Sequence, residues 1–340
     1  MKNKRQHLSY CQREGKIIAM ENEDRIMFLE TPPFYAIWGD GSILKRYPID
    51  FYEKTDISNI AGLSIFAGLK DRSNKFISGK FIGKSVYELY KENPELFGSE
   101  EERKWEIVPI QVGIGHACSD LSIQVHPRED YALKHENCHG KSECWYIVDV
   151  DEEPMDVVLG HKAKAMEELE DYIARDAYDD LALRTPIHKG TFLNLEAGTL
   201  HSLQKGTTFI EVCTSCLLTY RFYDYHRKDK NGKERQLDIE KAKANILIPY
   251  EEMTYDFKEY NYGLAKEKEL IDNHNYSVRI IDVVGASVVP KKKPFYACFV
   301  IEGEGEVEGY KVKAGSSFLL TSKISEMHVN GKLKILAAHG

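Results

Sequence analysis

Four residues that can bind a divalent metal ion lie in or beside strand-like runs in the middle of the chain. In the run LSIQVHP (residues 121–127), alternate residues face opposite sides of a strand, so Gln124 and His126 share a face. Glu143 opens the run ECWYI, and His201 follows a Gly-Thr-Leu turn that would deliver it to the start of another strand. If the face of the ECWYI run that carries Glu143 is the inward one, an amide, two imidazoles and a carboxylate face one cavity.

This set of donors is suited to zinc. Two imidazole nitrogens, one carboxylate and one amide oxygen are ligands of a borderline divalent cation, and they leave a coordination position for water or for substrate oxygens. The alternative is that these residues are ordinary core or surface side chains, since a chain with 12 histidines often places two of them on inward strand faces. The spacing alone leaves both interpretations open.

A run rich in aromatic and charged residues, TYRFYDYHR (residues 219–227), provides a candidate for charge stabilisation. By strand alternation Arg221, Tyr223 and Tyr225 share one face. One interpretation is that Arg221 enters the cavity, where it stabilises an oxyanion or holds a phosphate. The other is an edge strand whose aromatic and ionic side chains pair across neighbouring strands.

Short β-rich runs must position these residues. They begin after Trp105, and turn residues separate them at the close spacing typical of sandwiches and barrels. Helical patterns are limited to residues 83–104, 163–184 and 238–247. Glycines at 303, 305 and 309 predict hairpin turns. The predicted fold class is therefore mainly β, with two jelly-roll barrels and helical insertions in the first.

The length of 340 residues is sufficient for two compact domains, at roughly 100 to 200 residues per domain. The composition is that of an ordinary globular protein. We predict a polar N-terminal extension over residues 1–26, a metal-bearing barrel with helical insertions over residues 27–250, and a smaller C-terminal barrel over residues 251–340.

The charge balance and the cysteines restrict the partners and the compartment. Lysine and arginine number 46 against 54 acidic residues, a net charge of -8 without a long basic block, which argues against nucleic acid and anionic membranes as partners. Seven scattered cysteines, an odd number, favour a reduced cytoplasmic compartment. No run approaches the about 18 apolar residues of a membrane span. We expect a monomer or a homodimer.

Four motifs, QVHP, GKSECWYIVD, EAGTLHSL and TYRFYDYHR, resemble in order and spacing the signatures of the class I mannose-6-phosphate isomerases of the short bacterial type. The resemblance covers residues 27–340 in outline. It implies a two-barrel, cupin-like fold and one zinc ion per chain. It also implies an aldose–ketose isomerase that acts on a small-molecule sugar phosphate, interconverting mannose 6-phosphate and fructose 6-phosphate through a cis-enediol.

The resemblance also implies roles for individual residues. The zinc ligands would be Gln124, His126, Glu143 and His201. Arg221 matches the arginine that the family assigns to catalysis, and Lys141 matches a lysine that lines the substrate site. Zinc and Arg221 would stabilise the enediolate, while Lys141 and Arg227 would add positive charge. The group that carries the proton stays open between a histidine, a carboxylate and a water molecule at the zinc.

Three segments depart from the family pattern. Gly113 stands where the family carries a lysine, residues 58–68 (SNIAGLSIFAG) lack an expected glutamate and tryptophan, and residues 214–219 replace a Ser-Ser-Asp-Thr-Thr run. One interpretation is drift that neighbouring residues compensate. The alternative is a diverged cupin that binds a sugar or sugar phosphate without efficient turnover, and an iron-dependent cupin dioxygenase is a third hypothesis.

Overall fold

The structure is a computed structural model that describes residues 24–49, 56–103, 105–228 and 231–340. Its contacts divide the described chain into two units. Unit 1 holds the described part of 1–32 together with 65–109 and 256–340, and unit 2 holds 33–64 and 110–255. Each unit therefore contains segments that are not consecutive in sequence, whereas the predicted domains are consecutive. The predicted domain boundaries stay a prediction. Most of the predicted extension, residues 1–23, lies outside the described residues.

Unit 1 is built on a nine-stranded antiparallel sheet with the order β1-β21-β19-β22-β17-β16-β15, in which β18 also pairs with β22 and β20 with β19. Its strands are β1 (Ile26–Leu29), β15 (Lys258–Tyr262), β16 (Ala265–Asp272), β17 (Ser277–Val283), β18 (Ser287–Pro290), β19 (Tyr296–Val307), β20 (Tyr310–Lys313), β21 (Ser317–Leu320) and β22 (Glu326–His339). The small β4 (Gly68–Leu69) and β5 (Arg72–Ser73) pair separately.

A short helical element within the pattern predicted at 83–104 is confirmed. The helix α3 (Val86–Glu92) is followed by the 3-10 helix η1 (Pro94–Phe97). Ser85 and Glu88 cap α3 reciprocally, each side chain bonding the backbone N–H of the other, which satisfies donors that the first turn leaves free. The ring of Pro94 lacks an N–H and interrupts the α-helix where the sequence predicts.

The predicted hairpin turns at Gly303 and Gly305 are wrong, whereas the turn at Gly309 is confirmed. Gly303 and Gly305 lie inside β19, and Gly309 with its φ of 76° connects β19 to β20. A Cβ on Gly305 would lie 2.1 Å from the backbone oxygen of Asn330, and one on Gly303 would lie 1.9 Å from that of Lys332. These two glycines therefore permit a close approach of β22 rather than a turn.

Unit 2 is built from two antiparallel sheets. The five-stranded sheet has the order β10-β9-β12-β7-β14, and the six-stranded sheet has the order β11-β8-β13-β6-β3-β2. The first comprises β7 (Ile123–Val125), β9 (Met155–His161), β10 (Ala182–Ile187), β12 (His201–Ser202) and β14 (Tyr220–Tyr223). The second comprises β2 (Pro33–Tyr35), β3 (Ile60–Phe66, of which 60–64 belong to unit 2), β6 (Ile110–His116), β8 (Glu143–Val150), β11 (Phe192–Leu195) and β13 (Thr207–Thr214).

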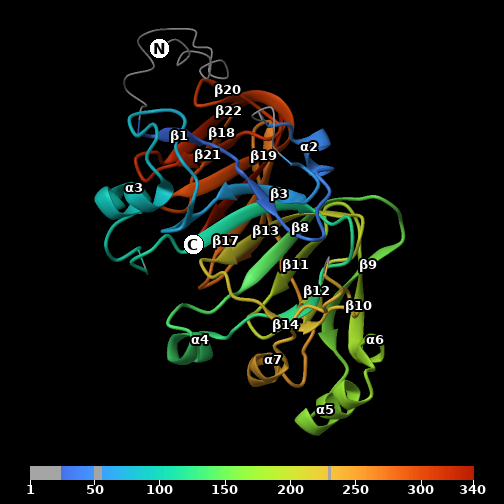
Figure 1. Cartoon of the computed structure of the whole chain (residues 1–340). Coiled ribbons are helices and arrows are strands. Elements are labelled where there is room, and N and C mark those ends of the chain that lie inside the picture. The colour runs from blue at the N-terminus through green and yellow to red at the C-terminus, as the bar shows by residue number, and fades with distance from the viewer. Residues whose placement is uncertain (1–23, 50–55, 104, 229–230) are drawn as a thin grey trace, which may run out of the picture. The chain divides into compact units, whose positions relative to one another are not determined.

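Two apolar clusters hold unit 2 together. One contains residues of both sheets, including Trp145 and Ile147 of β8 with Val157 and Leu159 of β9, so the sheets pack face to face. The other joins the five-stranded sheet to its helices. The helices of unit 2 are α2 (Ile43–Arg46), α4 (Glu129–His135), α5 (Met166–Ala174), α6 (Tyr178–Leu181) and α7 (Ile239–Asn245). Figure 1 shows α5, α6 and α7 grouped near β10 and β14.

The mainly β character is confirmed, and the assignment of two jelly-roll barrels stays a prediction. The helical pattern predicted at 163–184 is confirmed only in part, because α5 ends at Ala174, Asp176 adopts a φ of 53°, and β10 begins at Ala182. The pattern at 238–247 is confirmed as α7. Among the described helices, none combines the length and the apolar character that crossing a membrane requires.

Candidate metal centre

The five-stranded sheet supplies three of the four predicted metal ligands. Gln124 lies in β7, His126 follows directly after that strand, and His201 opens β12. In the antiparallel register His201 lies opposite Gln124, so both side chains belong to one face of the sheet. His126 is two residues further along and returns to that face.

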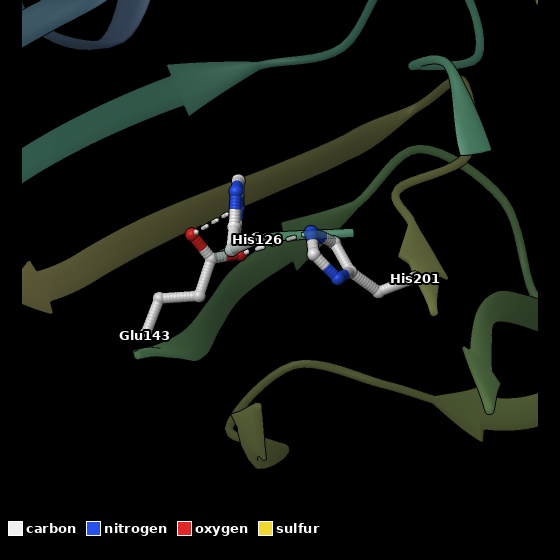
Figure 2. Close-up of side chains that lie close together, drawn as sticks. All are labelled: His126, Glu143 and His201. Carbon is white, nitrogen blue, oxygen red and sulfur yellow. Dashed lines mark ion pairs between the residues drawn. The ribbon is translucent and has the colours of Figure 1, made fainter. Parts of the chain in front are cut away.

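The facing sheet supplies Glu143, the first residue of β8. Its Oε2 atom lies 3.1 Å from Nε2 of His126, and its Oε1 atom lies 3.4 Å from Nε2 of His201. Figure 2 shows the carboxylate between the two imidazoles, with one oxygen directed at each ring. All three side chains are buried, and their donor atoms lie within 4.8 Å of one another. The structure thus brings together three residues of which the most distant in sequence, His126 and His201, are 75 positions apart.

Backbone carbonyls orient both imidazoles. Nδ1 of His126 lies 2.9 Å from the carbonyl oxygen of Leu218, and Nδ1 of His201 lies 2.8 Å from that of Thr199. A neutral ring whose Nδ1–H donates to a carbonyl carries a lone pair on Nε2. Both Nε2 atoms therefore point at the carboxylate, in the orientation that metal-binding histidines adopt.

The protonation states suit a cation. Burial lowers the pKa of His201 to about 3, so this ring is neutral at physiological pH. Burial opposes ionisation of Glu143, but Lys141 and His126 outweigh it and lower the pKa of the carboxyl group well below its ordinary value. Neutral imidazole and ionised carboxylate are the forms that bind metal ions.

The residues present fit a divalent metal ion. Both carboxylate oxygens of Glu143 are buried, and apart from the ion pairs of this group, including that of Oε2 with Lys141, neither has a hydrogen-bond partner among the described residues. Such an acceptor, turned toward the lone pair of a neutral imidazole, is stabilised by a cation between them. The side-chain amide nitrogen of Gln124 lies 3.2 Å from Nε2 of His201, and a half-turn of the amide brings its oxygen to the same place.

Lys141 lies against this group. Its Nζ atom is 2.8 Å from Oε2 of Glu143, 3.2 Å from Nε2 of His126 and 3.4 Å from Oε1 of Glu211. Burial favours the neutral amine, but the two glutamates outweigh it and raise the pKa of Lys141 well above its ordinary value. The lysine is therefore a buried, permanently charged ammonium group beside the candidate ligands.

Comparison with known proteins places these residues in a family. Residues 266–340 match the family model described as the cupin domain of mannose-6-phosphate isomerase. The mannose-6-phosphate isomerase of Streptococcus mutans is 31% identical over 92% of this chain and 98% of its own length. The probable mannose-6-phosphate isomerase GmuF of Bacillus subtilis is 33% identical over 78% of this chain and 85% of its own. The chain belongs to the mannose-6-phosphate isomerase family.

Solved structures agree with this assignment. The mannose 6-phosphate isomerase from Bacillus subtilis superimposes with a TM-score of 0.86 at 28% identity, covering 93% of this chain and all of the other. A phosphomannose isomerase from Salmonella typhimurium shares the fold at a TM-score of 0.74 and 14% identity. The predicted class I, cupin-type mannose-6-phosphate isomerase is thereby confirmed at the level of family and enzyme class, and the roles of single residues stay predictions.

Arg221 of this isomerase lies in β14, the edge strand of the five-stranded sheet, directly opposite Gln124. The register places its side chain on the face that carries Gln124 and His201. Burial and the nearby Arg235 lower the pKa of Arg221, although the group stays a cation. The register shifts between Arg221 and Tyr223, and Tyr225 adopts a φ of 55°, so the alternation predicted for these three residues is broken after Arg221.

One candidate residue of the isomerase site was missed in the sequence. Glu211 lies in β13 opposite Gly113 of β6 and Trp145 of β8, so it shares the inner face of the six-stranded sheet with Glu143. Its side chain is 31% exposed and contacts Lys141. A signal exists, because Glu211 is the single charged residue of the strand TTFIEVCT. A lone carboxylate on the inner face of a buried strand requires a partner.

Proposed function

We propose that the protein is a zinc-dependent aldose–ketose isomerase that interconverts mannose 6-phosphate and fructose 6-phosphate through a cis-enediol, with one Zn²⁺ per chain. The observation that carries the proposal is the buried group of His126, Glu143 and His201 in a member of this family. Gln124 completes a four-ligand set of nitrogen and oxygen donors without cysteine. Such a set suits zinc better than it suits softer metal ions, which prefer thiolate ligands.

Zinc would supply Lewis-acid polarisation of the substrate oxygens. The remaining work falls to the chain itself. Isomerisation removes a proton from C2 of the aldose to leave a cis-enediolate, moves the hydroxyl proton of O2 to O1, and returns a proton to C1, so that each of the two oxygens carries the negative charge in turn. Arg221 faces the same side as Gln124 and His201, so its fixed cation stabilises the negative charge that develops on these oxygens.

We propose Glu211 as the group that carries the proton. Glu143 is engaged by both imidazoles, whereas Glu211 is partly exposed on the same inner face and, among the site residues described above, contacts only the Lys141 ammonium group. A carboxylate that is reachable by substrate and held beside a cation is able to accept the C2 proton and deliver it to C1. Lys141 adds the positive charge that a phosphorylated sugar needs on a chain with a net charge of -8.

A coupled isomerase assay with metal analysis tests the proposal. Purified protein should contain about one zinc per chain, should lose activity in a chelator and should regain it when zinc is returned. Arg221→Ala should keep its zinc and lose about 10²-fold or more in kcat, because a fixed charge at the developing oxyanion is removed. Full activity in chelator, or in Arg221→Ala, would contradict the mechanism.

The second candidate function is a diverged cupin that binds a sugar or sugar phosphate without efficient turnover. It is favoured by Gly113, which offers no side chain on the inner face opposite Glu211. This function predicts thermal stabilisation of the protein by mannose 6-phosphate in the absence of isomerisation. A substantial turnover rate excludes it. The predicted cytoplasmic location and the predicted monomer or homodimer stay predictions.

A further inference from the structure

A buried carboxylate follows directly after β14. Asp224 is only 3% exposed, and two arginines of the next segment donate to it. Nε of Arg227 lies 3.1 Å from Oδ1, Nε of Arg235 lies 2.6 Å from Oδ2, and the Nη2 atoms of both arginines also contact Oδ1. Burial alone would raise the pKa of Asp224, but Arg235 and Arg227 outweigh it and lower the pKa. One ionised carboxylate thus joins the two ends of the segment 227–235.

The residues after Arg235 hold Arg221. The side-chain Nη1 atom of Arg221 donates to the backbone oxygen of Gln236 at 2.9 Å. The backbone N–H of Arg221 donates to the carboxylate of Asp238 at 3.2 Å, and the N–H of Asp238 donates to the backbone oxygen of Arg221 at 2.7 Å. The position of the guanidinium group therefore depends on the segment 236–238, which begins next to the Asp224–Arg235 pair.

The rest of the Arg221 guanidinium is left for another partner. Its Nε atom is buried and makes no hydrogen bond to any residue in the described ranges. The side chain belongs to the sheet face that carries Gln124 and His201. The hydrogen bond to Gln236 thus sets the direction in which the remaining N–H groups of Arg221 point. A shift of the segment 236–238 by about 1 Å is enough to misplace the guanidinium charge for catalysis.

We propose that Asp224 is a positioning residue for Arg221, acting through Arg235 and the backbone oxygen of Gln236. The inference rests on the proposed function, in which Arg221 stabilises the developing charge. Asp224 itself touches neither the candidate ligands nor Lys141 in the contacts found among the described residues. Its substitution should consequently change kcat and leave zinc content unchanged.

A double-mutant cycle distinguishes this role from simple loop stabilisation. Asp224→Asn keeps the side-chain size and removes the charge, and it should lower kcat by roughly 10- to 100-fold with little change in KM and with full zinc content. In an Arg221→Ala background the same substitution should have almost no further effect on kcat, because the group that it positions is absent. Equal effects in both backgrounds would overturn the proposal.

Two more variants keep the cycle decisive. Arg235→Gln removes the second link while Arg227 still neutralises Asp224, so it carries the same cycle if Asp224→Asn does not fold. Glu267→Gln is the matched control, a 1% exposed carboxylate in unit 1 that pairs with an arginine and a lysine, and it should lower the melting temperature without changing kcat. If Arg221→Ala alone is fully active, the proposed function fails, which is a different outcome from an additive cycle.

Discussion

Glu143 is the candidate ligand through which a bound metal ion would connect the two sheets of unit 2. The other candidate ligands, Gln124, His126 and His201, come from the five-stranded sheet, and Glu143 alone comes from the six-stranded sheet. A metal ion bound by all four would join the sheets. Because a group that binds only the folded protein stabilises it, zinc is expected to raise the unfolding temperature as well as to support catalysis.

The protonation of the candidate ligands predicts an acid-sensitive metal-free protein. With a folded pKa of about 3 and an ordinary value of 6.5, His201 takes up a proton on unfolding between these pH values, so stability is full above 6.5 and falls as the pH falls. Glu143, whose folded pKa is lowered, loses its contribution in the same direction. The melting temperature of chelator-treated protein should therefore be constant near pH 7 to 8 and should decrease below about pH 6.5.

His201→Asn is the comparison variant for this titration. It removes the depressed imidazole, so its melting temperature should decrease less steeply below pH 6.5 than that of the parent. His161, whose pKa burial also lowers, stays in both proteins and contributes equally to both profiles. A parent profile that is flat down to pH 5 would contradict the assignment of His201 as a buried neutral ring.

Gly113 provides a direct test of the substrate charge. A Cβ built on it lies 3.7 Å from the backbone oxygen of Leu63 and 3.7 Å from the ring of Phe34, which is ordinary contact, so a side chain can begin there without a clash. Gly113→Lys places a cation opposite Glu211 on the inner face. It should lower the KM for mannose 6-phosphate several-fold, because the added charge attracts a dianion.

Gly113→Met is the matched control, since it has similar length and no charge. It should leave the KM for the sugar phosphate unchanged or slightly raised. Unphosphorylated mannose, used as a weak substrate or inhibitor, should not distinguish the lysine variant from the methionine variant. An equal effect of both substitutions on the KM would show that bulk at this position matters and that charge does not.

At the scale of elements, the turn before β12 sets the position of both imidazoles. Gly198 donates its N–H to the backbone oxygen of His126. Its positive φ of 94° forms the turn that leads to Thr199, and the carbonyl of Thr199 orients the His201 ring. A Cβ at this glycine would lie 2.5 Å from the backbone oxygen of Asn245 in α7. Any other residue must therefore displace the turn or the helix.

Gly198→Ala should consequently weaken metal binding by roughly tenfold or more, the range found when a group that orients a ligand is disturbed. The measurement is zinc affinity by competition with a chromophoric chelator, together with the melting temperature. Gly309→Ala is the control, because Gly309 also has a positive φ of 76° but has open space around its Cβ. It should cost about 1–2 kcal/mol of stability and leave zinc affinity unchanged. Equal zinc affinities of the two variants would contradict the role of this turn.

The strands of the site could be predicted because their patterns are local. The runs ECWYIVDV and MDVVLGH coincide with β8 and β9, and the LSIQVHP alternation places Gln124 and His126 correctly on one face. In contrast, the sequences of β15 and β16, KEYNY and AKEKELID, are rich in charge and lack the apolar character from which the other strands are predicted. They are strands because β16 pairs with β17 along almost its whole length, and such pairing is decided by tertiary context.

The candidate site shows the same division. The positions of the four candidate ligands on strand faces and after a glycine turn can be predicted from short windows of sequence, whereas their role as ligands is implied by the family resemblance. Glu211 becomes a candidate only because β13 pairs with β8, which brings its side chain to Lys141. The two residues are 70 positions apart in the chain. Strand alternation would turn Asp224 away from Arg221, and its link to that residue through Arg235 depends on a turn at Tyr225 and His226 with positive φ at both.

At the scale of the whole molecule, a net charge of -8 coexists with several cationic side chains in unit 2, each of which lies near carboxylates. Lys141 is buried beside the candidate ligands. The pKa of Arg221 is influenced by the positive charges of Arg235 and Arg227 and by the negative charge of Asp224. The overall field disfavours extended polyanions, whereas a small anion experiences mainly the nearest groups because salt screens the rest within about 8–10 Å.

Unit 1 contains its own buried ionic group, distinct from the candidate metal centre. Arg279 in β17 is 1% exposed and lies 3.2 Å from Glu267, 2.7 Å from Glu269 and 3.3 Å from Asp272, and Lys292 also contacts Glu267 at 2.8 Å. Desolvation of such a group is expensive, so its charges are stable only while they stay paired. The loss of a single partner therefore leaves a buried charge without compensation.

Arg279→Met tests this requirement. It keeps the apolar stem but leaves Glu267 and Glu269 buried with less compensation, and it should reduce the free energy of unfolding by about 3–5 kcal/mol. Arg184→Met removes an exposed pair with Asp156, whose side chains are 39% and 45% exposed, and should cost less than about 1 kcal/mol. Denaturant unfolding measures both. Because every candidate ligand lies in unit 2, the zinc content per folded chain should be equal in the two variants. A loss of stability as small in Arg279→Met as in Arg184→Met would mean that the buried charges of unit 1 are solvated without their arginine.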